Sequence, residues 1–249
     1  MNAPSKAEVE LASRLISRKR LLPFVQRLND RYLAGWVHQD ICRRLEKFSD
    51  DVAKGLSPRL MLLMPPRSGK SELCSRAFPS WHLGRNPDHE IIACSYNVSL
   101  AMSFSKKVKE VLEDPTFHPV FDIRLNPNNQ SAEEWSLNGQ RGGYVAAGVG
   151  GGITGKGAHL LIIDDPLKNA EEADSADTRE KLWDWYGSTA YTRLAPGGGV
   201  LVVQTWWHDD DLAGRLQTAM AADPEADRFI VVKYPAIAEF DEYLDTDTD

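Results

Sequence analysis

The sequence has few cysteines and no long apolar run. Its three cysteines, Cys42, Cys74 and Cys94, are spaced neither as a disulfide framework nor as a zinc site. We therefore expect them to be reduced core residues of a cytosolic protein. No apolar run approaches the ~20 residues needed to cross a bilayer, and the N-terminus lacks the apolar core of a signal peptide. The sequence thus predicts no membrane partner.

An excess of positive charge is also absent. The chain carries 29 Lys and Arg against 36 Asp and Glu, a formal net charge of −7. This balance argues against a surface that coats nucleic acid indiscriminately, although a local basic channel is compatible with it. A hydrophobic content of 42% over 249 residues suffices for a sizeable core. One large domain, or one domain with appendages, is expected.

The most informative stretch is Leu60–Ser71, where an apolar run meets a Gly-Lys-Ser loop and then an amphipathic segment. This order predicts a strand, a phosphate-binding loop and a helix, because unpaired N–H groups at a helix N-terminus bind phosphate. Gly69 lets the backbone approach the ligand, Lys70 can reach the β- and γ-phosphates, and the Ser71 hydroxyl can bind Mg²⁺. The alternative is an ordinary loop that caps a helix. The candidate nucleotide ligands of the loop are Pro66, Arg67, Ser68, Gly69, Lys70 and Ser71.

A second apolar run, Leu160–Asp165, ends in two carboxylates. Ligands of a parallel sheet lie at the carboxyl ends of its strands. Asp164 is therefore expected to hold the Mg²⁺ shell, and Asp165 to orient or deprotonate the attacking water. The alternative is a strand followed by a polar turn, since Pro166 ends the strand in either case. Together the two motifs predict a P-loop ATPase with ATP and Mg²⁺ as cofactors.

The rest of the pattern alternates strands with helices, which predicts an α/β fold with a mainly parallel central sheet flanked by helices. Further strands are expected at 90–95, 200–205 and 229–233, helices at 37–53, 71–83, 98–113 and 176–194, and a turn at 196–199. The pattern of residues 5–34 predicts one or two N-terminal helices, and the composition of residues 114–132 predicts an irregular segment. We divide the chain into an N-terminal helical lead-in or lid (1–57), an ATPase core (58–235) and an acidic linker (236–249).

Four further features leave alternatives open. Asn138-Gly139 predicts a β-hairpin, either as a separate insertion or as strands added to the sheet edge. Gln39 is a candidate reader of adenine or a surface helix residue. The glycine-rich run 148–157, which contains Lys156, is either a loop that contacts polymer or neighbour, or a connector. The acidic cluster His208–Asp211 is expected to cap a helix rather than to bind metal.

Three segments together resemble the large terminase subunit of tailed bacteriophages, a family that packages DNA into procapsids. They are the Pro-Pro-Arg-Ser-Gly-Lys-Ser loop at 65–71, the glycine run leading into 160–166, and Val-Val-Gln-Thr-Trp-Trp-His-Asp-Asp-Asp-Leu at 202–212. The resemblance spans about residues 36–240. It implies an ASCE-type ATPase core with at least one strand between the two nucleotide motifs, which the strand at 90–95 is expected to supply. It also implies that nuclease activity belongs only to a full-length protein that continues into an RNase H-like domain.

By position, the resemblance implies specific roles. Lys70 and Ser71 match the family's phosphate and Mg²⁺ ligands, Asp164 the metal-shell acid, Thr205 the residue that senses the γ-phosphate, and Arg67 a phosphate-contacting arginine. The sequence departs from the family pattern at three positions, which are Met64 for Gly, Asp165 for the usual Glu, and Trp206 for Arg. The second departure leaves the catalytic base open among Asp165, Glu171 and Glu172, with Asp165 preferred.

The function implied is a motor that hydrolyses ATP to translocate double-stranded DNA into a procapsid. Its implied partners are the portal protein and the small terminase subunit, in the cytoplasm of the host cell. A homo-oligomeric ring is expected when the protein is docked on the portal, and a monomer in isolation. The alternatives are a helicase-like remodelling ATPase, which would need two RecA-like halves, and a nucleotide-dependent assembly module without processive turnover.

Overall fold

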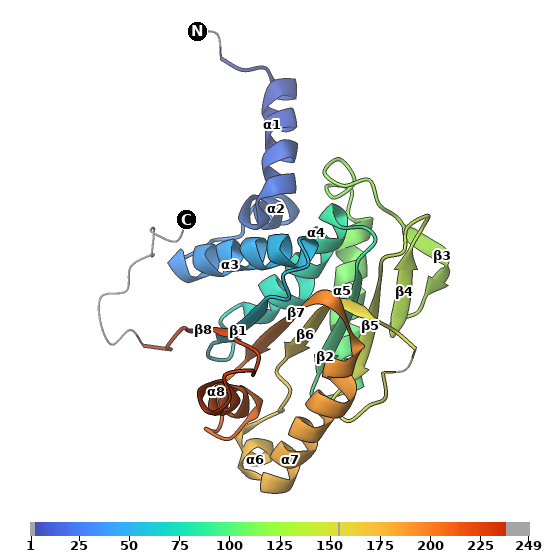
Figure 1. Ribbon diagram of the computed structural model, residues 1–249. Coiled ribbons are helices and arrows are strands. Elements are labelled where there is room, and N and C mark those ends of the chain that lie inside the picture. Colours follow the sequence, from blue (N-terminus) through green and yellow to red (C-terminus); the bar gives the residue numbers. More distant parts are fainter. Residues whose placement is uncertain (1–2, 154, 238–249) are drawn as a thin grey trace.

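A single eight-stranded sheet organises the fold, with strands in the order β3-β4-β5-β2-β6-β7-β1-β8. The computed structural model describes residues 3–153 and 155–237. Helices cover both faces of the sheet (Figure 1). The strands are β1 (Arg59–Leu63), β2 (Glu90–Ser95), β3 (Leu125–Gln130), β4 (Glu134–Leu137), β5 (Gly143–Gly148), β6 (Ala158–Asp164), β7 (Leu194–Gln204) and β8 (Ile230–Lys233). The predicted α/β class with a mainly parallel sheet is confirmed.

The helices form two layers. One face of the sheet carries α2 (Leu21–Leu28), α3 (Trp36–Ala53), the π-helical turn η1 (Glu72–Ala77), α4 (Phe78–Arg85) and α5 (Val98–Glu113). The other face carries α7 (Ala176–Trp185), the π-helical turn η2 (Tyr186–Ala190) and α8 (Leu212–Ala222). The remaining helices are α1 (Lys6–Lys19), α6 (Ala170–Asp174) and the 3₁₀ turn η3 (Tyr191–Arg193). No helix in the described ranges is long and apolar enough to span a membrane.

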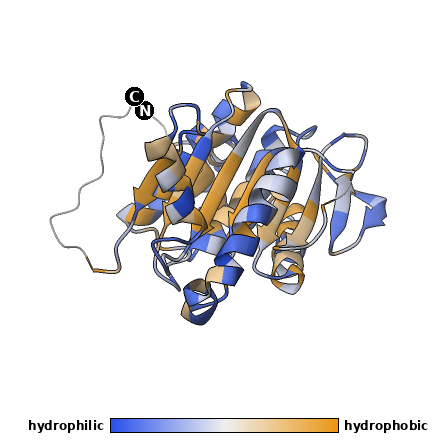
Figure 2. Ribbon diagram, turned by 60° about the horizontal axis from the view of Figure 1, so that its bottom comes forward, coloured by the Kyte–Doolittle hydropathy of each residue, from blue (hydrophilic) through white to orange (hydrophobic). Residues whose placement is uncertain are grey.

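The central strands are apolar because both of their faces are buried, as is usual for parallel sheets. Along β1, Leu60 and Leu62 join one hydrophobic cluster while Met61 joins the other. The strand β1 pairs in parallel with β7 and β8, and β6 pairs in parallel with β2 and β7. Figure 2 shows this as hydrophobic strands at the centre, with hydrophilic residues on the outer sides of the helices.

The strand that separates the two nucleotide motifs in space is β7, which lies between β1 and β6. The expectation that residues 90–95 supply this strand is therefore wrong. They form β2, which pairs with the far side of β6. The reason is the crossover order. The chain leaves β1, passes over two strand positions to β2, and fills the gap only later with β6 and β7.

The hairpin prediction is confirmed, and its strands extend the sheet edge. Strands β4 and β5 pair antiparallel, with Trp135 opposite Tyr144, and Gly139 in the turn has a φ of +71°. Residues 125–130, expected to be irregular, form the edge strand β3, where a proline is tolerated because one side of the strand needs no ladder donor.

The glycines at 197–199 lie within β7 instead of forming the predicted turn. The predicted helix at 176–194 is likewise shorter, because α7 ends at Trp185 and is followed by η2 and η3. A Cβ at Gly199 would lie 2.6 Å from Val52 Cγ2 and 2.7 Å from Phe48 Cζ. Gly199 therefore lets β7 pass directly beneath α3.

Candidate active site

The phosphate loop connects β1 to η1 at the carboxyl edge of the sheet. Two of its residues have left-handed backbone conformations, Arg67 with φ +60° and Gly69 with φ +80°. Glycine adopts this conformation without steric cost, whereas arginine does so rarely. Alternation of backbone hand turns successive N–H groups toward one point and forms an anion-binding concavity. The loop thus has the backbone character expected of a phosphate site.

The start of α3 packs against this loop through His38. The N–H of Gly35 donates to His38 Nδ1 at 3.2 Å, so the other ring nitrogen carries the proton and Nε2 donates to the Ser68 carbonyl at 3.3 Å. A Cβ at Gly69 would stand 3.4 Å from the same imidazole. His38 therefore supports the loop from the N-terminal helices. Periodicity carried no signal for this contact, because it depends on how α3 docks.

Gln39, the proposed adenine reader, is not brought to the loop. Its side chain is exposed and lines a separate pocket together with Arg20, Leu22, Cys42, Arg43 and Glu46. The neighbouring position on the helix makes the loop contact instead.

Lys70 joins the ends of three strands. Its Nζ donates to Thr205 Oγ1 at 2.8 Å and lies 3.0 Å from Asp165 Oδ2, with only 5% of the lysine side chain exposed. The Thr205 N–H donates to the other carboxylate oxygen, Asp165 Oδ1, at 2.9 Å. The structure thus brings together three predicted site residues, Lys70, Asp165 and Thr205, from segments far apart in the sequence.

Asp165 has an unusual backbone, with φ +44°. Its N–H donates to the Val203 carbonyl at 2.8 Å, and its own carbonyl accepts from the Tyr96 N–H at 3.2 Å. A non-glycine residue in this region costs on the order of 1–3 kcal/mol and persists where the surroundings fix it, often at functional sites. Here the two neighbouring strand ends hold the residue so that its carboxylate meets Lys70.

Asp164 is almost fully buried, with 1% of the residue exposed. Its Oδ2 accepts a hydrogen bond from Ser75 Oγ at 2.5 Å, while Oδ1 has no hydrogen-bond partner among the described residues. Burial, followed by the neighbouring Asp165 charge, raises the pKa of Asp164 to about 6, and the hydroxyl of Ser75 opposes that shift. A buried carboxylate oxygen without a partner calls for a cation or water.

The donor set fits Mg²⁺. This ion favours oxygen ligands and is usually held by one or two carboxylates together with water and substrate phosphates. The described residues contain no group of three or more His, Cys, Asp or Glu side chains arranged to hold a metal, as an all-protein zinc cage would require. Asp164 and the Ser71 hydroxyl are the residues that would hold Mg²⁺.

The other two carboxylates considered as bases, Glu171 and Glu172, lie on α6. Glu172 Oε2 accepts from the Lys168 N–H at 2.9 Å, and the side chain of Glu171 is exposed. The carboxylate that meets Lys70 is that of Asp165, and this favours it as the base. Arg67, in the loop, has an exposed side chain.

Asp211 caps α8, as predicted for the acidic cluster. Its Oδ1 accepts from the Gly214 N–H at 3.1 Å, and its Oδ2 accepts from Gln204 Nε2 at 2.8 Å. The residue directly before Thr205 is therefore tied to the start of the next helix. Both side chains of this pair are buried.

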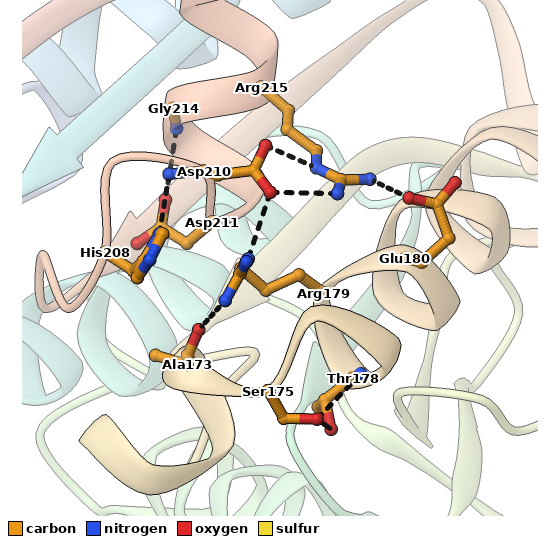
Figure 3. A network of polar contacts seen from close by, with 10 residues as sticks. All are labelled: Ala173, Ser175, Thr178, Arg179, Glu180, His208, Asp210, Asp211, Gly214 and Arg215. Carbon is orange, nitrogen blue, oxygen red and sulfur yellow. Dashed lines mark hydrogen bonds and ion pairs between the residues drawn. The ribbon is translucent and has the colours of Figure 1, made fainter.

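Asp210 is the centre of a charged network that sequence reasoning missed (Figure 3). Its carboxylate accepts from Arg179 Nε at 3.0 Å and from Arg215 Nε at 2.9 Å, and Arg215 also bonds Glu180 at 2.7 Å. The two guanidinium groups, Arg215 first, hold the pKa of Asp210 at about 2. This network connects the segment after Thr205 to α7, which follows Asp165 in the chain.

The glycine-rich run 148–157 is attached at two points. Trp185 Nε1 donates to the Gly151 carbonyl at 3.0 Å, and Lys156 Nζ lies 2.6 Å from Glu134 Oε1. Gly151 therefore contacts α7, and Lys156 contacts the hairpin strand β4.

Comparison with known proteins gives two findings. The family model for the terminase large subunit, T4likevirus-type, N-terminal, matches residues 61–248. The crystal structure of the HK97 bacteriophage large terminase is similar over 79% of this chain and 40% of that chain, with a TM-score of 0.52 and 16% sequence identity. At this identity the likeness concerns the fold alone, and the chain spans 40% of the length of that terminase. No curated protein matches the sequence.

Proposed function

The chain belongs to the terminase large subunit family, T4likevirus-type, N-terminal, and from this premise we propose that it is an ATPase motor that translocates double-stranded DNA into a procapsid. The observation that carries the proposal is the meeting of Lys70, Thr205 and Asp165 beside the buried Asp164. This is the set of groups that Mg²⁺-dependent phosphoryl transfer to water needs, namely a phosphate cation, a metal-shell acid and a water-directing carboxylate.

The contacts of Lys70 suggest how nucleotide binding prepares the site. Phosphate oxygens would compete with the Asp165 carboxylate for the Lys70 ammonium group, because phosphate and carboxylate are both anions. When Lys70 turns to phosphate, Asp165 Oδ2 is released to accept the proton of the attacking water. Asp165 Oδ1 stays held by the Thr205 N–H, so the released carboxylate keeps its orientation.

The other residues have supporting roles. The loop N–H groups would cradle the phosphates, and Arg67, in the same loop, would contact them. Mg²⁺, which Asp164 and the Ser71 hydroxyl would hold, would neutralise negative charge that develops on the phosphates. Thr205, which accepts from Lys70 in this structure, would sense whether that lysine is engaged with phosphate.

We further propose the partners that a packaging motor requires. They are double-stranded DNA, the portal protein, the small terminase subunit and neighbouring copies in a ring, within the host cytoplasm. An assembly module that binds nucleotide without processive turnover is the second candidate. Stimulation of ATP turnover by DNA or by portal supports the motor, whereas binding without multiple turnovers supports the assembly module.

The direct test is substitution of Lys70 by Ala. Removing one preorganised charge from a transition state typically lowers kcat about 10²–10³-fold, and we expect at least this loss with retained secondary structure. Lys181→Ala is the matched control, because that lysine is 75% exposed on the surface of α7. Near wild-type turnover in the Lys70→Ala protein would contradict the assignment of residues 65–71 as a phosphate-binding loop.

A further inference from the structure

Ser75 is a buried serine that neither nucleotide motif accounts for. It lies in η1, the π-helical turn that directly follows the phosphate loop, and it is 1% exposed. Single π-helical turns within helices are found frequently at functional sites. Its Oγ donates to Asp164 Oδ2 at 2.5 Å, at the end of β6.

This hydrogen bond makes the two oxygens of Asp164 different. Oδ2 is occupied by Ser75, whereas Oδ1 has no hydrogen-bond partner among the described residues. A carboxylate without such a bond can rotate and present either oxygen in more than one direction. The Ser75 bond fixes the plane of the group.

We propose that Ser75 is a positioning residue for Mg²⁺-nucleotide, which holds Asp164 by Oδ2 so that Oδ1 is presented to the ion's shell. The proposal rests on the function proposed above. Ligating carboxylates are commonly held by such outer hydrogen bonds, and loss of one typically weakens metal affinity by 10–100-fold.

A purely structural role makes a different prediction. If Ser75 only satisfies a buried carboxylate, its removal lowers the stability of the free protein and leaves the Mg²⁺ dependence of nucleotide binding unchanged. A positioning role raises the Mg²⁺ concentration required, while nucleotide affinity without Mg²⁺ stays the same.

The experiment measures ADP binding by calorimetry in a Mg²⁺ series, with the whole 249-residue chain. The variants are Ser75→Ala, Ser75→Thr, which keeps the hydroxyl, and the control Ser80→Ala. Ser80, in the adjoining helix α4, is also buried, and its Oγ donates to the Arg76 carbonyl at 2.8 Å. Thermal unfolding of each variant establishes that it is folded before binding is measured.

We expect the half-saturating Mg²⁺ concentration to rise about 10-fold or more in Ser75→Ala, and to stay within about 3-fold of wild type in Ser75→Thr and Ser80→Ala. An unchanged Mg²⁺ requirement in folded Ser75→Ala overturns the inference, as does an equal rise in Ser80→Ala. If Ser75→Ala does not fold, Ser75→Cys replaces it. A rise in its half-saturating Mg²⁺ concentration then supports the inference, and an unchanged concentration overturns it. Absence of Mg²⁺-dependent ADP binding in the wild-type chain would instead overturn the proposed function.

Discussion

The neighbouring carboxylates Asp164 and Asp165 are predicted to respond oppositely to the same substitution. Asp164→Asn should stabilise the protein in the absence of Mg²⁺ at pH 8, whereas Asp165→Asn should destabilise it. The reason is their surroundings. Asp164 is buried against Asp165 with one unpartnered oxygen, while Asp165 has Lys70 as its counter-ion.

The magnitude for Asp164 follows from its pKa, which rises from 3.8 to about 6. A shift of roughly two units corresponds to about 3 kcal/mol, at ~1.4 kcal/mol per unit. An Asn side chain keeps an acceptor for Ser75 but adds an N–H₂ group that needs a partner, at a cost of about 1–2 kcal/mol. The expected net gain is about 1–2 kcal/mol. Since unfolding entropy is ~2 cal/mol/K per residue, the gain raises Tm by roughly 2–4 °C in a chain of 249 residues.

The pH dependence has a definite sign. Because folding raises the pKa of Asp164, its stabilising contribution is complete below the unfolded value near 3.8 and is lost as pH rises through about 6. The advantage of Asp164→Asn over wild type should therefore be largest at pH 7–8 and shrink as pH falls from 6 toward 4. For Asp165→Asn, loss of the Lys70 partner costs about 2 kcal/mol. Relief of Asp164 offsets part of that cost, which leaves Tm about 2 °C lower.

Thermal unfolding at pH 5 to 8 in the presence of EDTA measures both effects. EDTA removes divalent ions, which would otherwise stabilise the wild-type protein more than Asp164→Asn and so reverse the order of their Tm values. The reasoning is refuted if Asp164→Asn is less stable than wild type at pH 8, or if its advantage grows as pH falls. Equal shifts in both variants would show that the two carboxylates do not have the different environments described above.

Two further predictions concern the same region. Asp165→Asn should retain Mg²⁺-nucleotide affinity within about 3-fold but lower single-turnover hydrolysis by 10² or more, since it removes the proposed general base; a matching loss of affinity would assign Asp165 to binding. Trp185→Phe should speed limited proteolysis within residues 148–157 several-fold, because it removes the bond to the Gly151 carbonyl at 3.0 Å while keeping most of the buried ring. Trp183→Phe, on the same helix but only partly buried, is the control, and an equal acceleration there would contradict the role of the Gly151 bond.

The parts of the site that sequence predicted are those that local chemistry determines. A Gly-Lys-Ser loop after an apolar strand, two carboxylates at a strand end, and Asn-Gly between two strand-like runs each carry their signal within a few residues. Lys70, Asp164, Asp165 and Thr205 accordingly meet where parallel strands end.

What the sequence did not predict depends on packing between distant segments. The glycines of β7 have the composition of a turn, and the close approach of α3 to Gly199 cannot be read from the order of residues along the chain. His38 and Ser75 lie within predicted helices, and periodicity does not say which residues of a helix face a loop or a strand end. The order of β7 and β2 is a matter of crossover topology, since each strand alone fits either position.

The link between Gln204, Asp211 and the start of α8 has a mechanical consequence. Thr205 and the helix cap are joined through Gln204 by one buried hydrogen bond, so a displacement of the strand end would tilt the helix about its first turn. An 11-residue helix extends ~16 Å, and a tilt of about 5° at its base would displace its far end by more than ~1 Å. Asp210, clamped by Arg179 and Arg215 beside that first turn, would restrain the direction of the tilt. A small change in what Lys70 contacts would thus be magnified into a movement at the molecular surface.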